Sequence, residues 1–189
     1  SLREGFRFDS GLVSPQFVTN EKRMIAYHDE SLLMITDTTI SNVRDLMPVL
    51  ELAARDGRPL VIIAEEVSGE ALAACIMNAI RHRETGMGMT VSVIKAPRYG
   101  EERRSILQDL ATVTGASFFS RMSGKKIKDA EMTDFGLAAR VESTQKFTTI
   151  IDGKGNQEAI NTTIEGLKSM LKEADTTREA EQIQARISR

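Results

Sequence analysis

The feature that most constrains the fold is an alternation of short apolar runs with helical segments in the middle of the chain. Apolar runs long enough for one buried strand each occupy residues 32–36, 60–64, 91–95 and, more weakly, 116–119. Helical stretches at 41–55, 70–81 and 101–113 separate them. This order predicts an α/β fold with a mostly parallel central sheet, flanking helices and right-handed crossovers.

The ends of these helices also carry signals. Ser41 or Thr39 is placed to cap the first helix and Ser68 the second, while Gly57 and Gly115 follow the first and third as stop signals. These signals support the same order of elements.

The flanks of the α/β pattern differ from its middle. Residues 6–8, 12–17 and 141–151 alternate or run apolar in β-branched side chains, which predicts added antiparallel strands. Beyond residue 155 the period becomes helical, so we expect C-terminal helices over about 156–189, as an extension of a single domain covering 1–189. The last helical pattern reaches residue 189 without a stop signal, which we interpret as the end of an excised piece of a longer protein.

Charge and composition narrow the classes of partner. The 189 residues carry a net charge of −2 with no block of like charge, so we expect no nucleic-acid partner and no acidic tail. No apolar run approaches the ~20 residues of a membrane span, and the start lacks a signal peptide, so we expect an intracellular protein without membrane contact. The single cysteine, Cys75, lies in an apolar run and is expected to be buried and unpaired.

Few residues point to catalysis. His28 and His82 have no Cys, Asp or Glu at metal-ligand spacing, and we interpret them as exposed loop or helix-end residues, with no metal site and no catalytic residue expected. The sequence Asp152-Gly-Lys-Gly155 follows a strand pattern and precedes a helical one, so its N–H groups and Lys154 could meet a phosphate. It lacks the third glycine and the Lys-Ser/Thr pair of a phosphate loop, which favours a tight turn.

That turn nevertheless supports a rival hypothesis, a nucleotide- or small-molecule-binding α/β enzyme domain. The rival predicts phosphate in the Asp152-Gly-Lys-Gly155 turn and a polar pocket at the carboxyl ends of the strands.

Two helical segments are more apolar than docking on a core requires. In 41–55, Val43, Met47, Leu50 and Ala54 form one stripe, and Leu46, Val49, Ala53 and Leu52 extend the apolar arc. One interpretation places both this helix and the next between the sheet and the C-terminal helices. The other is a groove, lined by Met and branched aliphatic side chains, that binds apolar segments of other chains.

Seven motifs, taken in order, resemble the apical domain of group I chaperonins, the GroEL family. The resemblance covers nearly the whole chain, and the motifs that carry it are EGFRFDSGLVSPQF at 4–17, ISNVRDLMPVLE at 40–51, PLVIIAEE at 59–66, GEALA at 69–73, KAPRYGEERR at 95–104, LQDLATVTG at 107–115 and TTIIDGKG at 148–155.

The resemblance implies an α/β domain with a β-sandwich-like flank, and it also implies a site and its partners. Non-native polypeptides and the mobile loop of a lid co-chaperonin would bind an extended segment and two helices, in a subunit of a seven-membered ring located in the bacterial cytoplasm or inside an organelle. The implied binding residues are Leu12, Ser14, Gln16 and Phe17 in the segment, Met47 and Leu50 in the first helix, and Leu72, Ile76, Met77 and Asn78 in the second.

The resemblance also implies which residues of the first helix pack and which bind clients, and which domain of the full-length protein binds ATP. Val43, Leu46, Val49 and Ala53 would hold the first helix down, and Met47 and Leu50 would be left for clients. ATP and Mg would belong to an equatorial domain that this sequence does not contain, so the fragment itself is expected to bind no cofactor, to be monomeric and not to hydrolyse ATP.

Some positions depart from the family's pattern. Leu12 and Gln16 stand where tyrosines are usual, Arg98-Tyr99 replaces Gly-Phe, and the loop within 81–90 is longer. Less aromatic area implies a weaker or shifted preference for clients and lid.

Overall fold

The computed structural model describes residues 5–153 and shows a mixed α/β fold, as predicted. The predicted C-terminal helices over 156–189 lie outside the described residues. The strands are β1 (Gly5–Phe8), β2 (Ala26–Thr36), β3 (Thr39–Ile40), β4 (Leu60–Ala64), β5 (Glu66–Val67), β6 (Val91–Lys95), β7 (Phe118–Phe119), β8 (Gly136–Ser143) and β9 (Thr148–Gly153). The helices are α1 (Val43–Asp56), α2 (Gly69–Thr85) and α3 (Gly100–Thr114), with 3-10 helices η1 (Pro15–Phe17), η2 (Ile127–Asp129) and η3 (Met132–Asp134).

One sheet organises the described residues. Its strand order is β1-β9-β8-β2-β4-β6, and β7 pairs with β2 beyond the end of the β2–β8 ladder. Strands β2, β4, β6 and β7 are parallel, whereas β8, β9 and β1 add an antiparallel half. The added strands therefore continue the central sheet, with β8 paired to β2.

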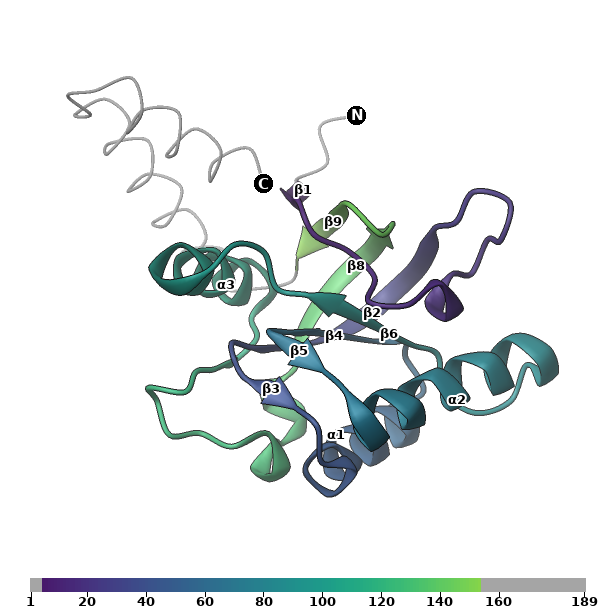
Figure 1. The fold of residues 1–189 in the computed structure, drawn as a ribbon, viewed down its shortest axis with the longest axis horizontal. Coiled ribbons are helices and arrows are strands. Elements are labelled where there is room, and N and C mark those ends of the chain that lie inside the picture. The colour runs from purple at the N-terminus through teal and green to yellow at the C-terminus, as the bar shows by residue number, and fades with distance from the viewer. Residues whose placement is uncertain (1–4, 154–189) are drawn as a thin grey trace.

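The helices cover the sheet from both sides. Figure 1 shows α1 and α2 side by side below the sheet and α3 above it. The short parallel pair β3 and β5 follows β2 and β4 and leads into α1 and α2. Crossovers of this kind place the carboxyl ends of β2, β4, β6 and β7 at one edge of the sheet.

The predicted helices lie where the structure has them, but the predicted caps do not all form. Asn42, and neither Ser41 nor Thr39, caps α1, because its Oδ1 accepts a hydrogen bond of 2.9 Å from the Arg44 N–H. Ser68 occupies the cap position of α2 without a side-chain cap bond. Gly57 ends α1 with φ of 90°, a left-handed conformation that glycine adopts without steric cost.

One predicted strand is wrong, and another is shorter than predicted. Residues 12–17 form an isolated bridge at Leu12 and then η1, because Ser14 Oγ accepts a hydrogen bond of 3.2 Å from the Gln16 N–H and closes a turn. The predicted strand at 116–119 is only Phe118–Phe119, since the Ala116 N–H bonds the helix carbonyl of Ala111.

Candidate functional site

Helix α1 buries one continuous face. Leu46, Val49, Leu50 and Ala53 are its buried residues, and at 3.6 residues per turn they span about 100° of the helix surface. Leu50 is only 5% exposed, so the expectation that it is left accessible for clients is wrong. Val43 is half-buried rather than one of the anchors, and α1 packs against both α2 and η2. These contacts with α2 and η2 partly explain why α1 carries more apolar side chains than docking on the sheet requires.

Met47 lies outside the buried face of α1. Its side chain is 42% exposed, as the division of the helix predicts. It is the one implied site residue of α1 that a ligand can reach in this conformation.

Helix α2 presents the other implied residues at graded exposure. Met77 is 70% exposed, whereas Leu72 and Ile76 are half-buried and pack against the core at their inner edges. Asn78 donates a hydrogen bond of 2.8 Å from Nδ2 to the carbonyl of Ala74. Its amide is therefore engaged within α2, which makes Asn78 the least available of the four.

The N-terminal segment lies against α2 but contributes few accessible side chains. Leu12 and Phe17 are buried in the core, so the structure contradicts an exposed role for both. Ser14 is half-buried and serves as the cap of η1. Gln16 is exposed and bound to α2, because Arg83 donates to its carbonyl at 3.1 Å and to its Oε1 at 3.2 Å.

The implied site residues thus lie on neighbouring elements, but only part of the set is at the surface. Elements η1 and α1 both pack on α2. Met47, Met77 and Gln16 are exposed, with Leu72 and Ile76 half-buried beside them. The arrangement offers flexible, apolar side chains on two adjacent helices, which suits ligands of varied sequence.

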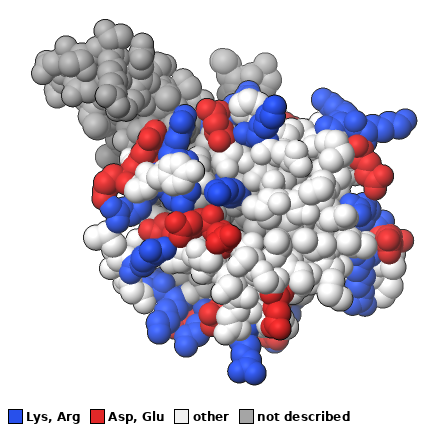
Figure 2. All heavy atoms as spheres, in the orientation of Figure 1, with Lys and Arg blue, Asp and Glu red and all other residues white. Residues whose placement is uncertain are grey.

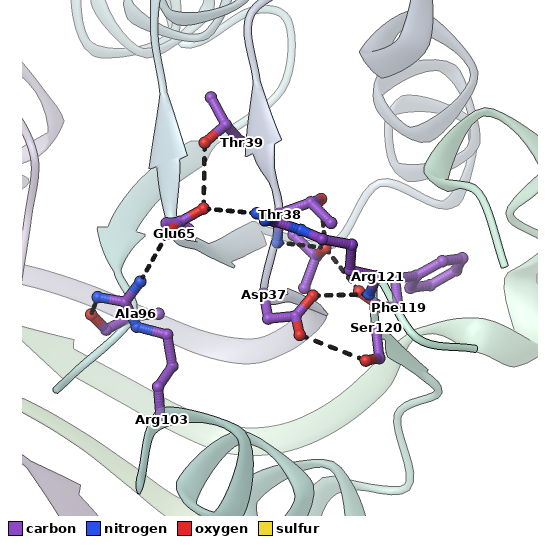
Figure 3. A network of polar contacts seen from close by, with 10 residues as sticks. Asp37, Thr38, Thr39, Glu65, Ala96, Arg103, Phe119, Ser120 and Arg121 are labelled. Atoms are coloured by element: carbon purple, nitrogen blue, oxygen red, sulfur yellow. Dashed lines mark hydrogen bonds and ion pairs between the residues drawn. The ribbon is translucent and has the colours of Figure 1, made fainter. Parts of the chain in front are cut away.

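A second set of polar residues lies where the parallel strands end. Glu65, which follows β4, accepts from Arg103 at 3.3 Å, from Arg121 at 2.9 Å and from Thr39 at 3.3 Å. Figure 3 shows these side chains converging on the Glu65 carboxylate. The network joins the ends of several strands and was not anticipated from the sequence, because its members are far apart in the chain.

Asp37, which follows β2, holds the loop after β7. Its carboxylate accepts from the Arg121 N–H at 2.8 Å and from the Ser120 hydroxyl at 3.3 Å (Figure 3). Beside this contact lies a cavity of about 460 Å³, lined by Thr38, Thr39, Ile40, Asp45, Ser120, Arg121, Gly124, Lys125, Lys126, Ile127 and Lys128. A polar pocket at the carboxyl ends of the strands is one of the two features that the rival enzyme hypothesis predicts.

The other feature of that hypothesis, the turn at Asp152-Gly-Lys-Gly155, is described only in its first half. Asp152 and Gly153 continue β9, with Asp152 at φ of 50°, and Lys154 and Gly155 lie outside the described residues. Neither Asp152 nor Gly153 lines the cavity, so the two features belong to different places.

His28 is buried, which corrects its prediction as an exposed residue. It lies on β2, and its Nε2 is 2.6 Å from the hydroxyl of Ser92 on β6. Burial, and then the nearby His82, lower the pKa of the His28 imidazole from 6.5 to about 4. The neutral ring is therefore a structural group of the core at physiological pH.

His28 also borders a cavity of about 420 Å³ between η1, β2 and α2. Gln16, Phe17, His82 and Arg83 are among its other lining residues. The Nδ1 atom of His82 is buried there without a hydrogen-bond partner among the described residues. The hydroxyl of Ser92 is buried beside His28, so a substrate cannot reach it as a nucleophile.

Residues 5–153 contain no cluster of three or more His, Cys, Asp and Glu side chains placed to hold a metal ion. In the same range, none of the helices has the length and apolar character needed to cross a bilayer.

Comparison with protein-family models finds no match to this chain.

Proposed function

We propose that the chain binds exposed apolar segments of non-native polypeptides on the surface formed by α1 and α2. In this proposal it is the polypeptide-binding domain of a chaperonin-like ring protein, and the mobile loop of a lid co-chaperonin uses the same surface. ATP hydrolysis would reside in other domains of the full-length protein.

The observation that carries the proposal is the exposure of Met47 and Met77 on two adjacent helices. Both are large apolar side chains with 42% and 70% of their surface in water. Half-buried Val43, Leu72 and Ile76 lie on the same two helices. Val43, Met47 and Leu72 fall within motifs that resemble the client-binding helices of chaperonin apical domains, and Ile76 and Met77 follow the motif at 69–73 on the same helix.

The physical basis of binding is burial of apolar area. Each Å² removed from water contributes roughly 25 cal/mol, with no need for a particular client sequence. Because Leu12, Phe17 and Leu50 are already buried, the accessible area is smaller than the resemblance alone implies. We therefore expect weak binding by one domain and tight binding only when several domains of a ring hold one client.

The proposal is tested by fluorescence anisotropy with a labelled, apolar, hairpin-forming peptide. The variant Met47→Glu/Met77→Glu places charges on the proposed surface and should lose binding at least tenfold. A matched control, Met24→Glu/Met122→Glu, changes two methionines that are exposed elsewhere and should bind as the unchanged protein does. A charged residue at position 50 is unsuitable as a test, because Leu50 is buried and an unpaired charge in the core would unfold the domain.

Equal binding by both variants would overturn the proposal, provided that circular dichroism shows both to be folded. A peptide copy of a co-chaperonin mobile loop should compete with the labelled peptide, and failure to compete would remove the shared use of the surface.

A further inference from the structure

The loop between β7 and β8 surrounds the cavity at the carboxyl ends of β2 and β7 with cations. Arg121, Lys125, Lys126 and Lys128 all line it, and among the lining residues that the structure describes the one acidic side chain is Asp45, in the first turn of α1. Figure 2 shows Lys and Arg side chains gathered at the lower left of the view, the side on which Figure 1 places this loop. This local excess of positive charge contrasts with the net charge of −2 of the whole chain.

Two of the four cations have carboxylate partners and two do not. Arg121 pairs with Glu65 at 2.9 Å, and Lys125 pairs with Asp134. Within residues 5–153, no carboxylate lies at ion-pair distance from Lys126 or Lys128, and both side chains are exposed. Their positive charge is therefore available to a ligand.

The framework that carries these cations is held at both ends. Asp37 accepts from the Arg121 N–H at 2.8 Å at the beginning of the loop. Near its end, Asp134 accepts from the Ser117 hydroxyl at 2.7 Å and from the Glu131 N–H at 2.8 Å. In between, η2 packs against α1 and buries Ile127. An anchored loop loses less conformational entropy when a ligand binds.

We propose that this cavity binds a small, multiply charged phosphate compound, a ligand class distinct from the apolar segments of the proposed function. A cavity of about 460 Å³ lies within the usual 300–1,000 Å³ of small-molecule sites. Phosphoryl oxygens accept charge-assisted hydrogen bonds from ammonium and guanidinium groups, which are the donors that Lys126, Lys128 and Arg121 supply. The position at the carboxyl ends of parallel strands is the usual ligand-binding edge of α/β sheets.

The charge pattern also excludes a cation as the ligand. The two unpaired lysines would repel a metal ion, and Asp45 alone supplies too few oxygen ligands. The carboxylates of Glu65 and Asp134 are already committed to Arg121 and Lys125.

The test is calorimetric titration of tripolyphosphate into the protein at low salt. The variant Lys126→Gln/Lys128→Gln removes the two unpaired charges without leaving any carboxylate unpaired, and it should weaken binding at least about tenfold. The matched control Lys22→Gln/Lys146→Gln removes the same charge from exposed residues outside the cavity and should stay within about twofold.

Three results would overturn the proposal: no binding of tripolyphosphate at millimolar concentration, equal weakening by the control, or unchanged binding by Lys126→Gln/Lys128→Gln. A hexaglutamate peptide is titrated in parallel. If that peptide binds more tightly than tripolyphosphate and depends on the same lysines, the site recognises acidic polypeptide and the phosphate assignment is wrong.

Discussion

The Nε2 atom of His28 on β2 lies 2.6 Å from the Oγ atom of Ser92 on β6, and both side chains are buried. The pair ties the long strand β2 to β6 across β4. Burial keeps the imidazole neutral by lowering its pKa to about 4.

This contact predicts a loss of stability in mild acid. In the unfolded chain the imidazole takes up a proton as the pH falls below 6.5, whereas in the folded protein it stays neutral until about pH 4. The contribution of His28 is therefore complete above pH 7, and up to about 3 kcal/mol of it is lost between pH 6.5 and 4. Urea unfolding at a series of pH values measures this change.

Two variants separate burial from the hydrogen bond. His28→Gln should flatten the pH dependence in that window, because the imidazole whose pKa is lowered by burial is no longer present. Ser92→Ala should keep the dependence, since burial is its main cause, while lowering stability at pH 7 by about 1 kcal/mol. A slope that is the same with and without His28 would contradict the assignment.

Among the arginines of residues 5–153, Arg103 is predicted to be the most costly to replace. It is buried, and its guanidinium donates to the carbonyls of Ala96 at 3.2 Å and Pro97 at 3.3 Å as well as to Glu65. Arg103→Leu leaves these backbone acceptors without a donor and should cost about 2–4 kcal/mol of unfolding free energy. The neighbouring Arg104→Leu should cost less than about 1 kcal/mol in the same denaturation experiment, because Arg104 makes a surface ion pair. Equal losses would show that the buried contacts contribute little.

Gly11 is predicted to tolerate no side chain. A Cβ atom there would collide with the backbone carbonyl of Thr144, whose oxygen accepts the Leu12 N–H at 2.8 Å. Gly11→Ala should therefore lower the melting temperature and cost about 1–3 kcal/mol. Gly5→Ala is the control: its Cβ would meet its nearest neighbour at 3.8 Å, an ordinary contact, and the change should stay within about 0.5 kcal/mol. A Gly11→Ala protein as stable as the control would contradict the close approach.

The central strands were predictable because their signal is unambiguous. β4 and β6 run over the residues that the apolar runs predict, Leu60–Ala64 and Val91–Lys95. Strands covered by helices on both faces are apolar throughout, so no alternation is needed to recognise them. The added antiparallel strands were predicted correctly for β1 and β9 for a related reason, their richness in β-branched and aromatic residues.

The errors arose where a distant partner or a local hydrogen bond decides the structure. The polar residues around His28 give no strand signal, but their pairing with β8 makes them part of β2. Ser14 and Pro15 favour a turn that the apolar alternation of 12–17 conceals. The burial of Leu50 depends on neighbours that periodicity within one helix cannot identify.

The candidate sites differ in how far the sequence indicates them. Met47 and Met77 were predicted from the resemblance and lie at the surface. The basic cavity was not predicted, because Lys126 and Lys128 approach Thr38 and Asp45 only through the packing of η2 on α1.

The central claim, that apolar polypeptide segments bind across α1 and α2, is tested most directly by methyl NMR. The protein is labelled with carbon-13 at the methionine methyl groups, the signals are assigned with single Met→Leu variants, and the apolar hairpin peptide is titrated. We predict that the Met47 and Met77 signals shift together and reach saturation at one peptide concentration, while those of the exposed Met24 and Met122 stay in place. Shifts confined to Met24 or Met122, or none at millimolar peptide, would contradict the account.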